Sequence, residues 1–316
     1  MAKAEMALLG WIAPTDHGWY EFLSSRPFRE EVNFWTPSAY WAFKSDEFTP
    51  FLFKLKAPHN AIAGFGYFAR YSRLPDWLAW ECFGEGNGCT DFLSFRERLA
   101  GLRKNLKDPT QTAPIGCIIL AGVSFFPPED WIPQPADWPK SNLRPMRYDL
   151  AIGEGARVWS ECMARAQASF GTRGSDTGIL ETERRYGEPT LVRPRLGQGV
   201  FRVAVTDAYG RACAATREHS LPALEAAHIR PYSLDGPHDV SNGLLLRADI
   251  HRLLEQGYVT VTTDHVLEVS GRLREDYQNG RSYYPLHGRE IAVPSSPAER
   301  PSAEMLQWHN ENVFLG

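Results

Sequence analysis

The chain has 316 residues, which is long for one globular domain and comfortable for two. Hydrophobic residues make up 43% of it and charged residues 23%, values ordinary for a soluble protein in which each half builds a core. No apolar run approaches the roughly twenty residues of a membrane span, and Met1–Leu9 is too short for a signal peptide. The five cysteines form no C-x-x-C pair, which argues against a zinc ribbon and a disulfide scaffold. We therefore expect a cytoplasmic protein without a membrane partner.

The formal net charge of −4 hides an uneven placement of the cations. Every lysine lies at or before Lys140, and the lysine and arginine cations beyond it are all arginines. The planar guanidinium fork suits phosphate oxygens, so a local basic face can bind nucleic acid although the whole chain is acidic. The alternative is that these arginines pair with nearby carboxylates. The clustered arginines are Arg184, Arg185, Arg193, Arg195, Arg202, Arg211, Arg217, Arg230, Arg247 and Arg252.

Residues 1 to about 130 are rich in aromatic side chains and predict strands around one or two helices. Strands are expected over Val32–Tyr40, Phe48–Ala57 and Ala61–Tyr71, with the turn P-H-N between the last two. Helical spacing predicts a helix over Asp91–Lys104, whose first residue is the expected N-cap. The apolar run Ile115–Phe126 predicts a buried central strand.

This order of elements, with F-K-L-K followed by G-F-G-Y-F-A, resembles the PUA-like superfamily that includes EVE, YTH, ASCH and SRA domains. The resemblance implies an α+β barrel over residues 1–150 that reads nucleic acid, commonly holding one unstacked base between aromatic rings. The alternative for each aromatic residue is a place in the hydrophobic core. Candidate pocket residues are the aromatic Trp35, Tyr40, Trp41 and Trp80 and the polar Asn33, Ser38 and Asn87.

The middle of the chain joins this domain to a second one, expected over residues 151–316. Pro127–Pro145 is too rich in proline for regular structure and predicts a stiff connector or a strap. Helical spacing predicts a helix over Asp149–Phe170, which we place at the start of the second domain. Tyr186–Gly199 is expected to form an arm, and Phe201–Arg211 a helix.

His228, Asn242 and His251 mark the stretch that carries the chemistry. A short strand is expected over Leu224–Pro231 and a short helix over Ala248–Gln256, because a polar Gly/Pro/Asp loop separates them and Gly257 follows the helix. Ala212–Thr216 is the expected partner strand. A hairpin is expected after the helix, with strands over residues 258–261 and 266–269.

Four sequence segments surround these residues. They are R-x-C-A-x-T before the first histidine, A-A-H-I-R-P-Y around it, N-G-L-L-L-R-A-D-I-H-R-L-L after it, and G-Y-V-T-V beyond the helix. Together they resemble the HNH (ββα-metal) endonucleases of the bacterial restriction-like branch. The resemblance implies that His228 is the general base, since a neutral imidazole suits that task near pH 7. It implies that Asn242 orients the imidazole ring or holds the loop, and that His251 binds a metal ion.

Glu255 lies one helical turn beyond His251 and is our first choice to complete the metal site. Many family members carry an Asp or His ligand just before the base, whereas this chain has Ala227, so Glu225, Asp249 or the phosphate are alternative donors. One imidazole with oxygen ligands favours Mg²⁺ or Mn²⁺ over a tightly held Zn²⁺.

The resemblances imply a metal-dependent DNA endonuclease that binds double-stranded DNA and restricts DNA carrying a modified cytosine, with a homodimer cutting both strands. Two alternatives remain open: an HNH nuclease that reads no modification, and a nucleic-acid-binding protein whose nuclease site is vestigial. The arginines expected to bind DNA are Arg195, Arg230, Arg247 and Arg252.

Overall fold

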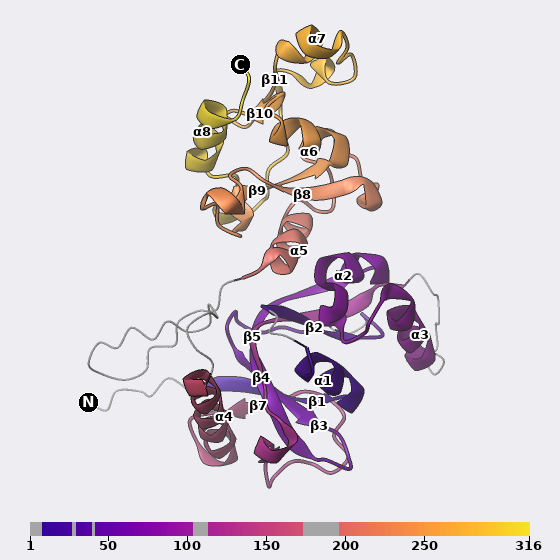
Figure 1. Ribbon diagram of the computed structural model, residues 1–316, viewed down its shortest axis with the longest axis vertical. Coiled ribbons are helices and arrows are strands. Elements are labelled where there is room, and N and C mark those ends of the chain that lie inside the picture. Colours follow the sequence, from indigo (N-terminus) through magenta and orange to yellow (C-terminus); the bar gives the residue numbers. More distant parts are fainter. Residues whose placement is uncertain (1–7, 27–29, 40–41, 104–112, 173–195) are drawn as a thin grey trace, which may run out of the picture. The chain divides into compact units, whose positions relative to one another are not determined.

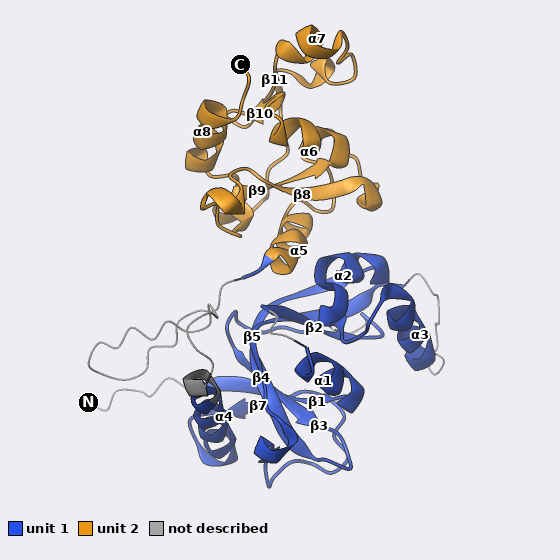
Figure 2. Cartoon of the chain, in the orientation of Figure 1, with its two compact units in different colours: residues 1–197 blue, residues 198–316 orange. Residues whose placement is uncertain are grey.

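The computed structural model describes residues 8–26, 30–39, 42–103, 113–172 and 196–316 (Figure 1). The chain divides into two compact units, Met1–Gly197 and Gln198–Gly316, called here the first and the second unit (Figure 2). Both units mix helices and strands, which gives the α+β class expected from the sequence. Among the described residues, no helix combines the length and the apolar character that a membrane span requires.

A seven-stranded sheet organises the first unit, in the order β2-β5-β4-β3-β1-β7 with β6 paired to β4. Strands β1 and β3 run parallel, and the other pairs are antiparallel. The strands are β1 (Leu9–Thr15), β2 (Glu31–Thr36), β3 (Pro50–Leu55), β4 (Ala61–Leu74), β5 (Ile115–Phe125), β6 (Ile132–Pro133) and β7 (Met146–Asp149). The helices of this unit are α1 (His17–Ser24), α2 (Asp76–Phe83), α3 (Phe92–Arg103) and α4 (Gly153–Thr172).

The sheet is open among the described residues, because β2 and β7 end its order without pairing to each other. The sequence-based expectation of a closed barrel is therefore not met. Strand β4 shows the physical reason, since Phe65 lies in one hydrophobic cluster and Phe68 in another. Trp159 of α4 joins the first cluster and Trp19 of α1 joins the second. Side chains from helices bury each face, so the sheet does not have to close on itself.

Helix α4 belongs to the first unit, although its place in the sequence favours the start of the second domain. Its buried residues Val158, Trp159 and Cys162 pack with Phe65 of β4 and Ile132 of β6. These contacts bury the apolar stripe of the helix against the sheet. The two compact units divide after Gly197, so α4 lies within the first of them.

The strands predicted for this part of the chain are present as β2, β3, β4 and β5, within a few residues of the expected ends. The predicted helix after Asp91 is α3, and the Asp91 Oδ1 atom accepts a hydrogen bond of 2.8 Å from the backbone N–H of Ser94. This is the contact by which an N-cap side chain satisfies a free donor in the first helical turn. The cap prediction is confirmed.

The second unit consists of short elements around one core. Its helices are α5 (Gln198–Ala208), α6 (Ala248–Glu255), α7 (Arg272–Tyr277) and α8 (Ala303–Asn312). Its strands are β8 (Leu224–His228), β9 (Gly243–Arg247), β10 (Val259–Val261), β11 (Val266–Val269) and β12 (Arg289–Glu290). Strands β8 and β9 form an antiparallel pair, and β10, β11 and β12 form a separate antiparallel sheet, which includes the predicted hairpin.

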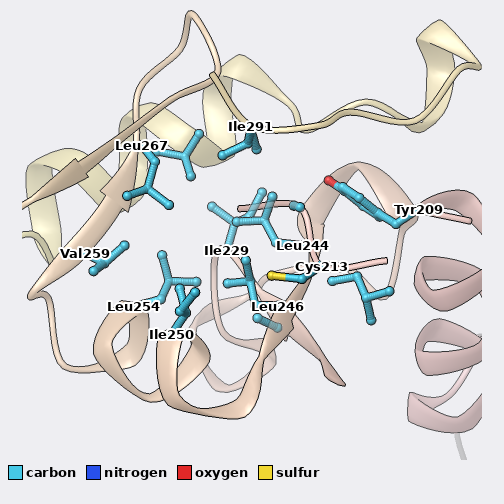
Figure 3. Packing of buried hydrophobic residues seen from close by; sticks show 14 of the residues in the cluster. Tyr209, Cys213, Ile229, Leu244, Leu246, Ile250, Leu254, Val259, Leu267 and Ile291 are labelled. Atoms are coloured by element: carbon cyan, nitrogen blue, oxygen red, sulfur yellow. The ribbon is translucent and has the colours of Figure 1, made fainter. Parts of the chain in front are cut away.

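Leucines of β9 lie at the centre of the core of this unit (Figure 3). Leu244 and Leu246 are about 1% exposed or less and pack with Ile250 and Leu254 of α6 and Leu267 of β11. Burying a leucine side chain contributes roughly 1.5–3 kcal/mol. The apolar run L-L-L therefore fixes β9 between the helix and the hairpin.

The strand that partners β8 differs from the expected one. Residues Ala212–Thr216 form turns, and β8 pairs instead with β9, which places His228 opposite Gly243. Arg211 and Arg217 on either side of the turns have φ angles of 60° and 62°, a conformation that extended strands do not adopt. The motif is therefore strand, loop, strand and helix, with the polar loop between its two strands.

Gly257 ends helix α6 in the way that the sequence predicts. Its φ angle is +76°, which lies in the left-handed region that glycine adopts without penalty. A Cβ atom here would lie 2.1 Å from the carbonyl oxygen of Val313, because the C-terminal segment packs directly against the glycine.

Candidate active site

His228 ends strand β8 with its ring flat against the ring of Phe201 in α5, at 3.8 Å between ring centroids and 12° between planes. The close approach of α5 depends on Gly243, the residue opposite His228. A Cβ atom on Gly243 would lie 2.4 Å from Val205 Cγ2 and 3.1 Å from the Phe201 ring. The glycine of the Asn-Gly pair thus serves packing, and it lets the core hold one face of the imidazole.

The other contact of His228 is a second histidine that sequence reasoning missed. His228 Nε2 lies 3.0 Å from Nδ1 of His238, and the His238 ring stacks on Tyr232 at 4.4 Å and 11°. Among the described residues, no hydrogen bond reaches His228 Nδ1. One ring nitrogen is engaged and the other is available to a water molecule.

Burial, together with the charges of His238 and His251, lowers the pKa of His228 to about 4. The ring is therefore neutral at pH 7 and can accept a proton.

Asn242 is fully buried and makes three side-chain hydrogen bonds to the loop between β8 and β9. Its Oδ1 accepts from the N–H of Arg230, and its Nδ2 donates to the carbonyl oxygens of Arg230 and Pro237, each at 2.9 Å. The sequence leaves two roles open for this amide, orienting the imidazole or holding the loop. The structure places its hydrogen bonds on the loop.

His251 lies on α6 between two carboxylates. Its Nδ1 is 2.7 Å from Glu225 Oε2, and its Nε2 is 3.4 Å from Glu255 Oε1. A carboxylate only accepts, so Nδ1 carries the hydrogen and donates it to Glu225. Because the hydrogen is on Nδ1, the neutral ring carries its lone pair on Nε2, the nitrogen that lies near Glu255. Ala227 is fully buried in the core and offers no donor from the adjacent strand position.

Asp249, an alternative metal ligand from the sequence, is engaged elsewhere. Arg247 binds it through Nε at 3.0 Å and through Nη2 at 2.5 Å, and the Tyr283 hydroxyl donates to it at 3.2 Å. Burial acts to raise the pKa of Asp249, but the hydrogen bonds and the charge of Arg247 outweigh it, so the net shift of this pKa is downward. This carboxylate therefore fixes Arg247 and Tyr283 rather than facing His251.

The candidate DNA-binding arginines differ in how exposed their side chains are and in the contacts that hold them. Arg230 Nε donates to the carbonyl of Leu234 at 2.6 Å, and its guanidinium lies 5.4 Å from the Trp308 ring centroid, so it anchors the loop. Arg252 is 76% exposed on α6 and approaches Glu255 only at 3.8 Å. Arg195 lies outside the described residues.

Four of the candidate pocket residues meet in the first unit. Trp35 and Trp80 both pack on Phe95, with ring centroids 5.1 and 6.0 Å away. The indole N–H of Trp35 donates to the carbonyl of Asn87 at 2.8 Å. Asn33 Nδ2 donates to Asn87 Oδ1 at 2.9 Å, and both amides are fully buried. Within the described part of the chain, the buried Asn33 Oδ1 has no hydrogen-bond partner.

The remaining pocket candidates are less informative. Ser38 contributes its backbone carbonyl to the hydroxyl of Thr36 at 2.9 Å. Tyr40 and Trp41 lie outside the described residues. The cluster around Phe95 is thus the part of the proposed pocket that the described residues form.

Residues 213–262 match the family model described as HNH endonuclease, which covers β8, β9 and α6 and the loop that they enclose. The chain carries an HNH endonuclease domain and is a hydrolase that cuts DNA. Among solved structures, the chain is similar to one described as a modification dependent TagI restriction endonuclease. The match has 10% sequence identity and a TM-score of 0.27, and it covers 92% of this chain and 78% of that one. No curated protein matches the chain.

HNH nucleases generally use a divalent metal ion, and the donors around His251 fit one. Among the described residues there is no group of three His, Cys, Asp or Glu side chains ready to hold a metal. His251 Nε2 and Glu255 offer one nitrogen and one carboxylate, while Glu225 holds the opposite ring nitrogen. A hard cation such as Mg²⁺ commonly takes one or two protein ligands and completes its shell with water and phosphate oxygens.

Proposed function

We propose that this chain is a metal-dependent endonuclease that restricts modified DNA. Its first unit reads a modified cytosine, and its second unit hydrolyses the phosphodiester at His228. The observation that carries the catalytic part is the β8–β9–α6 arrangement, in which His228 ends β8 and His251 of α6 contacts Glu225 of the same strand, with 2.7 Å between Nδ1 and Oε2. The carboxylate of Glu225 lies beside Nδ1 of His251, and the carboxylate of Glu255 lies beside its Nε2.

The chemistry follows from these positions. Hydrolysis needs a water molecule that loses a proton in line with the leaving oxygen. His228 is neutral at pH 7 because burial lowers its pKa to about 4, so it accepts that proton. A divalent ion, Mg²⁺ or Mn²⁺, held by His251 Nε2 and Glu255 would neutralise charge on the scissile phosphate. Arg252, exposed on the same helix, is our first choice for a contact to the DNA backbone.

The catalytic assignment is tested by His228→Ala in the full chain. Cleavage of plasmid DNA with Mn²⁺ should fall by about 10²–10⁴-fold, the usual contribution of a general base, while DNA binding stays unchanged. His219→Ala is the matched control, because this histidine of the same unit is exposed. Loss of both binding and cleavage in the His228 variant would show a structural role and reject the assignment.

The recognition proposal is supported by the cluster around Phe95. Trp35 and Trp80 offer stacking surfaces, and the Asn33–Asn87 amide pair lies beside them with one buried acceptor to satisfy. Stacking and hydrogen bonds to a base edge are how a flipped base is held. This cluster is therefore our candidate for the site that receives the base.

Plasmids with and without modified cytosine separate this proposal from its rivals. Preferential cutting of modified DNA supports it, whereas equal cutting indicates an HNH nuclease that reads no modification. Failure to cut either DNA with Mg²⁺ or Mn²⁺ indicates a vestigial site. Trp35→Ala should reduce the preference, and Trp11→Ala, which removes another half-buried tryptophan of the first unit, should not. An unchanged preference in the Trp35 variant removes this residue from the pocket.

We further propose that two chains act together. A double-strand break needs a cut in each strand, and each chain contributes the His228 site described above. A homodimer related by a two-fold axis would present one site to each strand. Sedimentation of the protein with and without DNA tests this, and a monomer in both conditions while it makes double-strand breaks would contradict it.

A further inference from the structure

A catalytic imidazole needs its second nitrogen held, because that contact sets the tautomer and the direction of the ring. In this chain Asn242 does not supply the contact, since its side-chain amide is hydrogen-bonded to the loop. His228 Nε2 instead lies 3.0 Å from Nδ1 of His238. The residue that meets the second nitrogen is therefore a histidine in the polar loop.

We propose that His238 is the positioning residue of this site, holding Nε2 of His228 so that Nδ1 faces the attacking water. The inference rests on the proposed function of His228 as general base. It goes beyond the HNH motif residues, because none of His228, Asn242 and His251 has this task.

The protons are accounted for as follows. Nδ1 of neutral His228 must be unprotonated to take a proton from water, so its hydrogen is on Nε2 and is donated to the lone pair of His238 Nδ1. When water attacks, one O–H bond breaks and its proton moves to His228 Nδ1, while the oxygen bonds to phosphorus and the P–O bond to the leaving group breaks. The resulting imidazolium keeps its Nε2–H bond to His238. A hydrogen bond from a charged donor is stronger than one from a neutral donor, so this contact strengthens as the reaction proceeds.

The surrounding loop is built to keep His238 in place. Tyr232 stacks on one face of its ring. Asn242 holds the backbone on both sides of it, because its Nδ2 donates to the carbonyl of Pro237 and its backbone N–H donates to the carbonyl of Asp239, each at 2.9 Å. The motif asparagine therefore acts on the catalytic ring through His238. This explains why an amide that does not touch the imidazole is part of the site.

Two substitutions separate the hydrogen bond of His238 from its packing. His238→Phe keeps a flat ring for the stack on Tyr232 but removes the acceptor. His238→Asn removes the ring but can return an oxygen acceptor near the position of Nδ1. His219→Phe is the matched control on an exposed histidine of the same unit.

Single-turnover cleavage of DNA with Mn²⁺ is the first measurement. The rate constant of His238→Phe should fall by about 10²-fold with an unchanged Kd for DNA, because proton transfer in a misdirected ring loses much of a general base's contribution. His238→Asn should recover at least about tenfold of that loss, and His219→Phe should match the wild type. Equal rates in wild type and His238→Phe would overturn the proposal, as would an equal loss in the Phe and Asn variants.

Nitrogen-15 NMR of the histidine rings, in the full chain without DNA, is the second measurement. The wild type should show His228 with its proton on Nε2 and a hydrogen-bonded shift there, and His238→Phe should lose that hydrogen-bonded shift. A wild-type ring with its proton on Nδ1 overturns the proposal. This readout does not need cleavage, so a wild type that cuts no DNA would reject the proposed function while the ring spectrum still decides the role of His238.

Discussion

Asn242→Ala gives the sharpest test of how the loop between β8 and β9 is held. The substitution removes three buried side-chain hydrogen bonds, to the Arg230 N–H, the Arg230 carbonyl and the Pro237 carbonyl. Each contributes about 1 kcal/mol net, so the closed loop should lose about 3 kcal/mol, and more where a partner stays buried without a replacement. Since about 1.4 kcal/mol corresponds to a factor of ten, the open state of the loop should become at least about 10²-fold more populated.

Hydrogen–deuterium exchange of the full chain measures this directly. Peptides from residues 229–242 should exchange about 10²-fold faster in Asn242→Ala, and cleavage should fall because His238 is no longer held beside His228. Asn312→Ala is the matched control, since Asn312 is exposed and makes a single hydrogen bond to the carbonyl of Trp308. If exchange in the loop changes by less than about threefold, the three hydrogen bonds do not close the loop and the reasoning is wrong.

Three further outcomes follow from the same geometry. Glu225→Gln should weaken Mn²⁺ binding by about 10–100-fold, measured by titration calorimetry, because the carboxylate that orients His251 is lost. With Mn²⁺ saturating, loss of cleavage due to protonation of His228 should begin only as the pH approaches 4, since its pKa is lowered to about 4 and the base stays neutral above that value. Burial also lowers the pKa of His309, so unfolding should become easier as the pH falls below about 6.5, where the unfolded chain binds a proton that the folded chain does not. His309→Gln should remove part of that acid dependence in urea unfolding, whereas His219→Gln should keep it.

Each of these outcomes has a clear contrary result. Unchanged Mn²⁺ affinity in Glu225→Gln would mean that the orientation of His251 does not govern binding. If cleavage were lost near pH 6.5, and variants at other residues still showed that loss, His228 would titrate as an exposed histidine does. An acid dependence identical in wild type and His309→Gln would show that the buried ring makes no contribution.

Much of the second unit could be predicted because its signals are local. The proline that ends β8, the polar Gly/Pro/Asp loop and Gly257 after the helix each act within a few residues, so they predicted strand β8, the loop and helix α6 in the right order, although strand β9 between the loop and the helix was not predicted. The partner of β8 was predicted wrongly because A-C-A-A-T is the nearest preceding apolar segment, although alanine has little preference for strands. The backbone conformations of Arg211 and Arg217, which prevent an extended chain there, have no mark in the sequence.

Contacts between distant residues were the other limit. His238 reads as an ordinary loop residue, and its place beside His228 depends on how Asn242 folds the loop. The role of Glu225 depends on the register of β8 beside α6. In the first unit, aromatic content, alternation and an apolar run predicted four strands. Whether a sheet closes depends on which helices cover its faces, and α4 lies far along the chain from β4.

The flat contact between His228 and Phe201 has a consequence for engineering. Phe201 and Val205 belong to the hydrophobic core, and one side of the same helix supports the reacting ring. Substitutions chosen to make the protein tolerate heat by filling space near Gly243 would displace the group that activates water. Resistance to heat and catalytic rate therefore depend on the same side chains in this enzyme. Variants selected for one property should be screened for the other from the start.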